Sequence, residues 1–165
     1  MTNADHLDKI EKIIKEVRTC MMATMNDSGE MRARPMATAD YDEHGNVWFF
    51  TDNDSAKVDE LSNQQPNLIT YSKTSDNTYL SMTGKIEVVK DLAKQKEKFS
   101  VFAKAWYPDG PESEDLILLK FVPQKAEYWD SPDSTIVQMW RIGKAVVTGT
   151  KYQTADDEHG KVTLK

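Results

Sequence analysis

The stretch Trp48–Lys57, WFFTDNDSAK, marks the place where the chain changes from an apolar strand to a polar turn. Val47–Phe50 is β-branched and aromatic, a composition that predicts a strand buried on both faces. Asp52–Ser55 has the composition of a turn, and Ser55 is suited to cap a helix that continues to about Asn63. These residues therefore predict a strand, a tight turn and a helix N-terminus in direct succession.

The predicted turn has the chemistry of an anion site. The hydroxyls of Thr51 and Ser55, the backbone N–H groups of a helix N-terminus and the ammonium of Lys57 together suit a dianionic phosphate. The same residues also fit an ordinary helix cap followed by an exposed lysine, and the segment alone does not separate the two interpretations. No glycine-rich run precedes Lys57, so the segment is not a Walker loop.

Outward from this stretch, the chain has the pattern of a mainly β protein. Apolar residues at helical spacing predict an amphipathic helix over Asp5–Arg18, and a second charged helix over Asp91–Lys104 is expected to bury Leu92, Phe99, Phe102 and Ala103. Gly84 predicts a bulge or a close backbone approach. Strands are expected at residues 20–25, 30–41, 47–50, 68–72, 79–89, 116–122 and 125–129. We therefore predict a small antiparallel β-barrel of about six strands, closed or nearly closed, with peripheral helices.

Composition limits the classes of function. A chain of 165 residues suits one domain, here residues 1–140, and the polar residues 141–165 are expected to form a partly ordered tail with a short apolar piece at Ala145–Val147. The net charge of −6 argues against nucleic-acid binding, and no apolar run approaches the roughly 20 residues of a membrane span. The single cysteine, Cys20, lies in an apolar run and is expected to be a buried small hydrophobe in a cytoplasmic protein. The three histidines have no metal-ligand spacing, so we expect no metal site.

Two further groups of residues have the chemistry of a ligand site. Arg32 and Arg34 alternate along one strand and project from one face, where they can hold a phosphate or the oxygen-rich rim of a heterocycle; they also fit a pair of surface arginines. Pro35 places this strand at an edge or a bulge. The four tryptophans are typical of core or interface, and each is also a candidate stacking platform: Trp48, Trp106, Trp129 and Trp140.

Taken together, these residues suggest a planar, phosphorylated, partly apolar ligand. The chain resembles the pyridoxamine 5′-phosphate oxidase-like FMN-binding split-barrel family, and within it the bacterial general stress protein type. The resemblance extends from about Asp5 to Ser131 and rests on the order and spacing of six segments: RARPM (32–36), DYDEHGNVWFFTDNDSAK (40–57), QPNLITYS (65–72), YLSMTGKIEVV (79–89), WYPDGPE (106–112) and AEYWDSP (126–132). It implies a six-stranded antiparallel split barrel.

The resemblance implies an FMN site, with FAD as an alternative cofactor. The T-x-x-x-S-x-K pattern that holds the FMN phosphate in the family falls on Thr51, Ser55 and Lys57. The strand arginine that approaches the flavin falls on Arg34, with Arg32 as its neighbour. Pro35 and Met36 would offer backbone groups to the pyrimidine edge of the ring.

The resemblance also implies a homodimer with two flavin sites at its interface. Tyr79 and Ser81 match positions that contact the flavin. Trp129 matches an aromatic residue contributed across the dimer, and Trp106 is a weaker candidate for the same role.

The substrate half of the oxidase pattern is missing. True oxidases follow the segment of Trp129 with an R-L-H-D-R stretch, whereas this chain has no His there and no Arg until Arg141. The substrate-binding lysine is also absent, and its place falls near Ala39. We therefore expect flavin binding and redox activity without oxidation of pyridoxamine phosphate. The alternatives are a non-catalytic flavin carrier or sensor, and a flavin reductase that uses NADH or NADPH.

Overall fold

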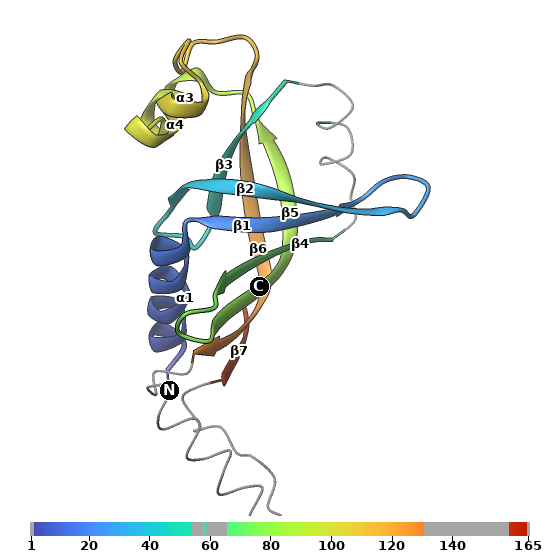
Figure 1. The fold of residues 1–165 in the computed structure, drawn as a ribbon, viewed down its shortest axis with the longest axis vertical. Helices are drawn as coiled ribbons and strands as arrows, with labels where there is room; N and C mark the ends of the chain where they lie inside the picture. The colour runs from blue at the N-terminus through green and yellow to red at the C-terminus, as the bar shows by residue number, and fades with distance from the viewer. Residues whose placement is uncertain (1, 54–57, 59–65, 131–158, 165) are drawn as a thin grey trace, which may run out of the picture.

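The computed structural model describes residues 2–53, 58, 66–130 and 159–164. Its centre is an antiparallel sheet that closes on itself (Figure 1). The strands are β1 (Thr19–Met25), β2 (Met31–Tyr41), β3 (Val47–Asp52), β4 (Asn67–Lys73), β5 (Thr78–Val89), β6 (Leu116–Asp130) and β7 (His159–Thr163). The helices are α1 (Asn3–Val17), α3 (Leu92–Lys98) and α4 (Val101–Trp106).

The strand order β3-β2-β1-β4-β5-β6 is closed by direct pairing of β3 with β6, and this confirms the predicted six-stranded antiparallel barrel. The long strand β6 makes the closure, because its first half pairs with β3 and its second half with β7. The two strands expected at 116–122 and 125–129 are therefore one strand, which pairs with β5 along nearly its whole length.

The barrel interior and one face of α1 form the main core. Burial alternates along β5, so Leu80, Met82 and Ile86 point inward, as a strand with one buried face requires. Helix α1 packs against β2, β4, β5 and β7 and buries Ile10 and Ile14. Thr2 and Asp5 form a reciprocal capping box at its start, which fixes the first turn.

Cys20 is fully buried in this core, which confirms the prediction of a small buried hydrophobe. Burial raises the pKa of its thiol to about 12, so the reactive thiolate form is disfavoured at neutral pH.

Gly84 lies where the register between β5 and β6 shifts, which confirms the expected bulge and close approach. A side chain at this position would collide with the carbonyl oxygen of Val122 and would lie 2.9 Å from Pro123 Cα. Only glycine lets the two backbones approach this closely.

The segment between β5 and β6 differs from the single helix expected over Asp91–Lys104. It forms two short helices, because Phe99 leaves the helical conformation and Ser100 caps α4 by accepting a hydrogen bond from the Ala103 N–H at 3.3 Å. Leu92 and Phe102 were expected to be buried and are exposed instead. Phe99 and Ala103 are partly buried against the side chains of β3 and β6.

The C-terminal residues include a strand that the sequence pattern did not predict. β7 adds to the free side of the second half of β6, and Gly160 packs directly on the ring of Tyr128. The apolar piece at 145–147 and, apart from Val58, the helix expected from Ser55 lie outside the described residues. None of the helices in the described ranges is long and apolar enough to cross a membrane.

Candidate functional site

A pocket of about 640 Å³ lies between β2, the end of β3 and α4. Its volume is within the roughly 300–1,000 Å³ of small-molecule and cofactor sites. The lining residues are Thr19, Arg32, Arg34, Pro35, Met36, Ala37, Thr38, Ala39, Phe50, Thr51, Asp52, Ser100, Phe102, Ala103, Trp106 and Tyr107.

The first wall is the part of β2 that has a neighbour on one side only. Residues 31–37 pair with β1, whereas the recorded pairing with β3 begins at Thr38. Pro35 can occupy this wall because a strand edge does not require its missing N–H. Arg34 donates a hydrogen bond to the buried Thr24 hydroxyl at 3.2 Å, which fixes its guanidinium beside β1. Arg32 lies opposite Thr24 in the same register and lines the same pocket.

The second wall is the end of β3, where the apolar strand becomes polar. Phe50 is buried, Thr51 is half-buried and Asp52 is exposed. Burial raises the pKa of the Tyr107 phenol, and the negative charge of Asp52 raises it further. Tyr107, which lines the same pocket as the arginines, is therefore neutral at physiological pH.

The third wall is α4, which presents aromatic rings to the pocket with little protein around them. Phe102 is 71% exposed and Trp106 is 76% exposed, although both line the pocket. The guanidinium of Arg18 lies 4.9 Å from the Phe102 ring centroid and makes a cation–π contact with that ring. The pocket thus combines a cationic polar side with an apolar aromatic side, which suits a planar ligand that carries an anionic group.

Of the residues predicted from the sequence, the pocket brings together Arg32, Arg34, Pro35, Met36, Thr51 and Trp106. Tyr79, Ser81 and Trp129 do not line it. Tyr79 and Trp129 face each other across β5 and β6, and Ser81 lies two residues further along β5. Ser55 and Lys57 lie outside the described residues.

The indole of Trp129 stacks on the imidazole of His159, with ring centroids 5.4 Å apart. His159 Nε2 lies 2.9 Å from Glu127 Oε1, and this contact joins β7 to β6 beside the indole. Trp129 nevertheless remains 39% exposed, so part of its ring faces outward.

Most of the α4 wall was not predicted from the sequence. Its pattern predicted Phe102 as a core residue and did not identify Ser100 and Tyr107 as lining residues. The spacing of Phe102 and Trp106, four residues apart, puts them on one helix face and was the available signal. Within the described ranges, no group of three or more His, Cys, Asp and Glu side chains is arranged to hold a metal ion.

Comparison with solved structures places the fold among known split barrels. A crystal structure from Jannaschia sp. CCS1, described under the name general stress protein 26, is 25% identical, covers 97% of this chain and 99% of that one, and has a TM-score of 0.75. The general stress FMN/FAD binding protein of Xanthomonas citri is 26% identical, covers 80% of this chain and 93% of that one, and has a TM-score of 0.68.

A curated relative is also similar. Protein bli-3 of Neurospora crassa is 24% identical over an alignment of 139 residues that covers 78% of this chain and 66% of that protein. The chain therefore matches slightly less than two thirds of the length of this relative. The family model described as pyridoxamine 5′-phosphate oxidase like matches residues 5–153, which is most of the sequence. The chain belongs to the pyridoxamine 5′-phosphate oxidase-like family.

Proposed function

We propose that the pocket binds FMN, with FAD as the alternative, and that the chain is a redox-active flavin protein of the general stress type. The observation that carries this proposal is the pocket itself, which sets two arginines and a strand edge opposite an aromatic helix face. The similarity to the Xanthomonas citri protein, whose name describes FMN/FAD binding, supports it.

The residues present fit a flavin nucleotide. Thr51, together with Ser55 and Lys57 in the adjoining sequence, would hold the phosphate, since hydroxyls and an ammonium suit a dianion. Arg32 and Arg34 would add positive charge beside it. The backbone of Pro35 and Met36 would meet the polar edge of the ring. When bound, a flavin supplies one- and two-electron chemistry, and the chain supplies binding, orientation and electrostatics.

We also propose a homodimer that forms through the outward face of the sheet. One row of residues crosses this face in register: Pro35 on β2, Met21 on β1, Thr70 on β4 and Ser81 on β5. Met21 is 44% exposed, and Tyr79 and Trp129 on the same face are 37% and 39% exposed, so several large apolar side chains are open on this face. The row begins at Pro35, at the edge of the pocket, and ends at Ser81, which lies near Tyr79 and Trp129. Tyr79, Ser81 and Trp129 would therefore contact the flavin held by the other subunit.

Oxidation of pyridoxamine phosphate is not part of the proposal. Ala39 lines the pocket near the place of the oxidase lysine, and a methyl group cannot bind a substrate phosphate. The R-L-H-D-R stretch is also missing after Trp129. Incubation with pyridoxine phosphate and oxygen should therefore yield no pyridoxal phosphate or peroxide, and clear turnover would contradict this part of the proposal.

The buried cysteine, with its raised pKa, is compatible with a reducing cytoplasmic compartment.

The deciding experiment is to purify the full chain, release any bound flavin and identify it by absorbance and mass. FMN in the extract supports the proposal, and FAD selects the alternative cofactor. A chain that is colourless and does not bind added FMN or FAD would refute it. Anaerobic titration with NADH or NADPH then separates the functions, because rapid bleaching indicates a reductase and persistent colour indicates a carrier or sensor.

A further inference from the structure

The α3–α4 segment carries one wall of the pocket but is attached to the barrel through a small contact region. The segment lies at the end of the barrel where β5 ends and β6 begins (Figure 1), and Arg18 at the end of α1 reaches the ring of Phe102. Its apolar attachment is a cluster centred on Trp48 and Phe50 of β3, in which Phe99 and Tyr107 pack near the Phe50 ring at centroid distances of 5.6 and 6.3 Å. The position of α4 therefore depends on a few contacts that lie outside the main core.

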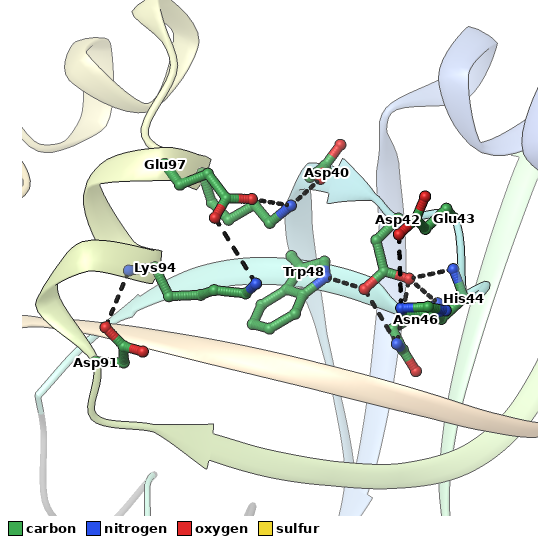
Figure 2. A network of polar contacts seen from close by, with 10 residues as sticks. Asp40, Asp42, Glu43, His44, Asn46, Trp48, Asp91, Lys94 and Glu97 are labelled. Atoms are coloured by element: carbon green, nitrogen blue, oxygen red, sulfur yellow. Dashed lines mark hydrogen bonds and ion pairs between the residues drawn. The ribbon is translucent and has the colours of Figure 1, made fainter.

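Polar contacts add to this attachment. The buried Gln95 of α3 donates to the carbonyl oxygens of Pro111 and Leu116 at 2.8 and 3.4 Å, and a second set of contacts surrounds Trp48. Its indole N–H donates to Asp42 Oδ2 at 2.8 Å, which fixes the ring in one orientation. The ammonium groups of Lys94 and Lys98, both from α3, lie 5.8 and 5.5 Å from the ring centroid. Figure 2 shows the indole between Asp42 on the β2–β3 turn and Lys94 on α3.

Lys98 also connects the contacts around Trp48 to β2, the first wall of the pocket. Its Nζ lies 2.6 Å from Asp40 Oδ2 and 2.9 Å from Glu97 Oε1, and its side chain is only 11% exposed. Asp40 directly follows Ala39, a lining residue of β2, at a point where the register with β3 shifts. Burial opposes the charge of Lys98, but the hydrogen bonds to Asp40 and Glu97 prevail and raise its pKa, so Lys98 stays protonated at neutral pH.

We propose that the Lys98–Asp40 ion pair, seated against the indole of Trp48, positions α4 as the wall of the ligand pocket. Asp40 belongs to β2 and Lys98 to α3, so the ion pair fixes the distance between β2 and the helical segment that carries α4. Because Lys98 is mostly shielded from water, salt screens this pair less than it screens an exposed pair. Lys98, Asp40 and Trp48 are thus positioning residues that act on a ligand through α4. The ligand part of this inference rests on the proposed flavin site.

The test compares Lys98→Met with Lys96→Met. Methionine keeps the apolar stem of the side chain and removes the charge. Lys96 lies on the same helix and pairs with Glu112, outside the pocket lining, so it is the matched control. Amide hydrogen exchange of residues 101–106 reports the docking of α4 without any ligand, and FMN titration reports its effect on binding.

In Lys98→Met, exchange in α4 should rise about tenfold while the amides of β1 and β4 stay as in the wild type, and FMN should bind about tenfold more weakly. Lys96→Met should change both by less than about twofold. Lys98→Arg should restore both. Asp40→Asn should change both readouts in the same direction, and the double variant should be no worse than Lys98→Met alone, because Asp40 acts through its ion pair with Lys98.

Three results would overturn the inference: unchanged exchange in α4, a uniform rise across the barrel, or faster α4 exchange with undiminished FMN affinity. If Lys98→Met does not fold, Asp40→Asn and Trp48→Phe decide by the same two readouts. If the wild type binds no flavin, the proposed function fails, whereas the exchange comparison still tests the positioning of α4.

Discussion

The carboxylate of Asp42 organises both the β2–β3 turn and the indole beneath α3. Oδ1 accepts from the backbone N–H groups of His44 and Asn46 at 3.0 and 2.9 Å, and Oδ2 accepts from the Trp48 indole at 2.8 Å. Partial burial acts to raise the pKa of this carboxyl, but the hydrogen bonds from Asn46, Trp48 and His44 outweigh it and hold the pKa below 3.8. The folded chain therefore binds this proton more weakly than the unfolded chain.

It follows that Asp42 makes the stability of the fold depend on pH. Its contribution is fully present well above pH 3.8 and is lost as the pH falls through the lowered pKa of the folded state. We expect Asp42→Asn to be about 1–2 kcal/mol less stable at neutral pH, because an amide cannot accept all of these hydrogen bonds. Between about pH 5 and pH 3 the variant should lose less stability than the wild type.

Urea unfolding at several pH values checks this prediction. Other carboxyls with lowered pKa values, such as Glu97 and Glu127, act in both proteins, so the difference between the two profiles isolates Asp42. Parallel profiles would show that the carboxylate carries no such role.

The proposed phosphate contact can be tested by replacing Lys57 and Ser55. Lys57→Ala and Ser55→Ala should weaken FMN binding by about tenfold or more, because each removes a hydrogen bond to a charged group worth about 1.5–3 kcal/mol. Riboflavin, which has no phosphate, should bind almost unchanged. Lys85→Ala, an exposed site on β5 outside the pocket lining, is the control for a lost positive charge. Equal loss for both flavins would mean that the phosphate lies elsewhere.

Among the elements, the six strands of the barrel were predictable, whereas the α3–α4 segment and β7 were not. Val47–Phe50 is apolar at every position and is buried at every position, so composition alone identified a strand covered on both faces. Over residues 91–104 the periodicity suggested one helix, but the cap at Ser100 divides it. Leu92 and Phe102 were expected to be buried, but of the four expected residues only Phe99 and Ala103 pack into the small cluster around Trp48 and Phe50, and Phe102 lines the pocket instead. Local pattern predicts that a face is apolar and does not say what covers it.

The pocket, too, could be predicted only where its residues belong to a local sequence pattern. The arginine pair and Thr51 could be identified because their chemistry is local to two strands. Ser100 and Tyr107 join them through the path of the chain from β5 to β6, which no short motif encodes.

Strand β7 was also missed, and its attachment depends on Gly160. A methyl group at this position would collide with the ring of Tyr128, whose hydroxyl is held 2.8 Å from His6 Nδ1. Gly160→Ala should therefore weaken the pairing of β7 with β6 and destabilise the fold by about 1–3 kcal/mol. Amide exchange of residues 159–163 should rise, and Trp129 should become more accessible to a quencher because His159 no longer covers it.

Lys161→Ala is the matched control, because Lys161 is exposed on the same strand and its ion pair with Glu127 is 3.5 Å long. It should exchange as the wild type does. Normal exchange of β7 in Gly160→Ala would mean that the ring of Tyr128 moves aside at little cost.

At the scale of the molecule, the barrel leaves two candidate flavin groups on different parts of one subunit. The pocket group lies between β2 and α4, whereas Tyr79, Ser81 and Trp129 lie on β5 and β6. The proposed two-fold dimer through the outward face would resolve this separation, since each subunit would then supply one group to each site. The oligomeric state and flavin binding should therefore be linked.

Met21→Glu tests that link. Met21 lies in the row that crosses the outward face, so two-fold symmetry would bring the new carboxylates into the same interface, where unpaired charges are costly. The wild type should run as a dimer in light scattering, and Met21→Glu should run as a folded monomer that binds FMN at least about tenfold more weakly. Leu92→Glu, at an exposed apolar site on α3 outside the pocket lining, should stay dimeric and bind FMN as the wild type does. A monomeric wild type, or a monomeric Met21→Glu with full FMN affinity, would show that one subunit forms the whole site and that Tyr79, Ser81 and Trp129 serve another purpose.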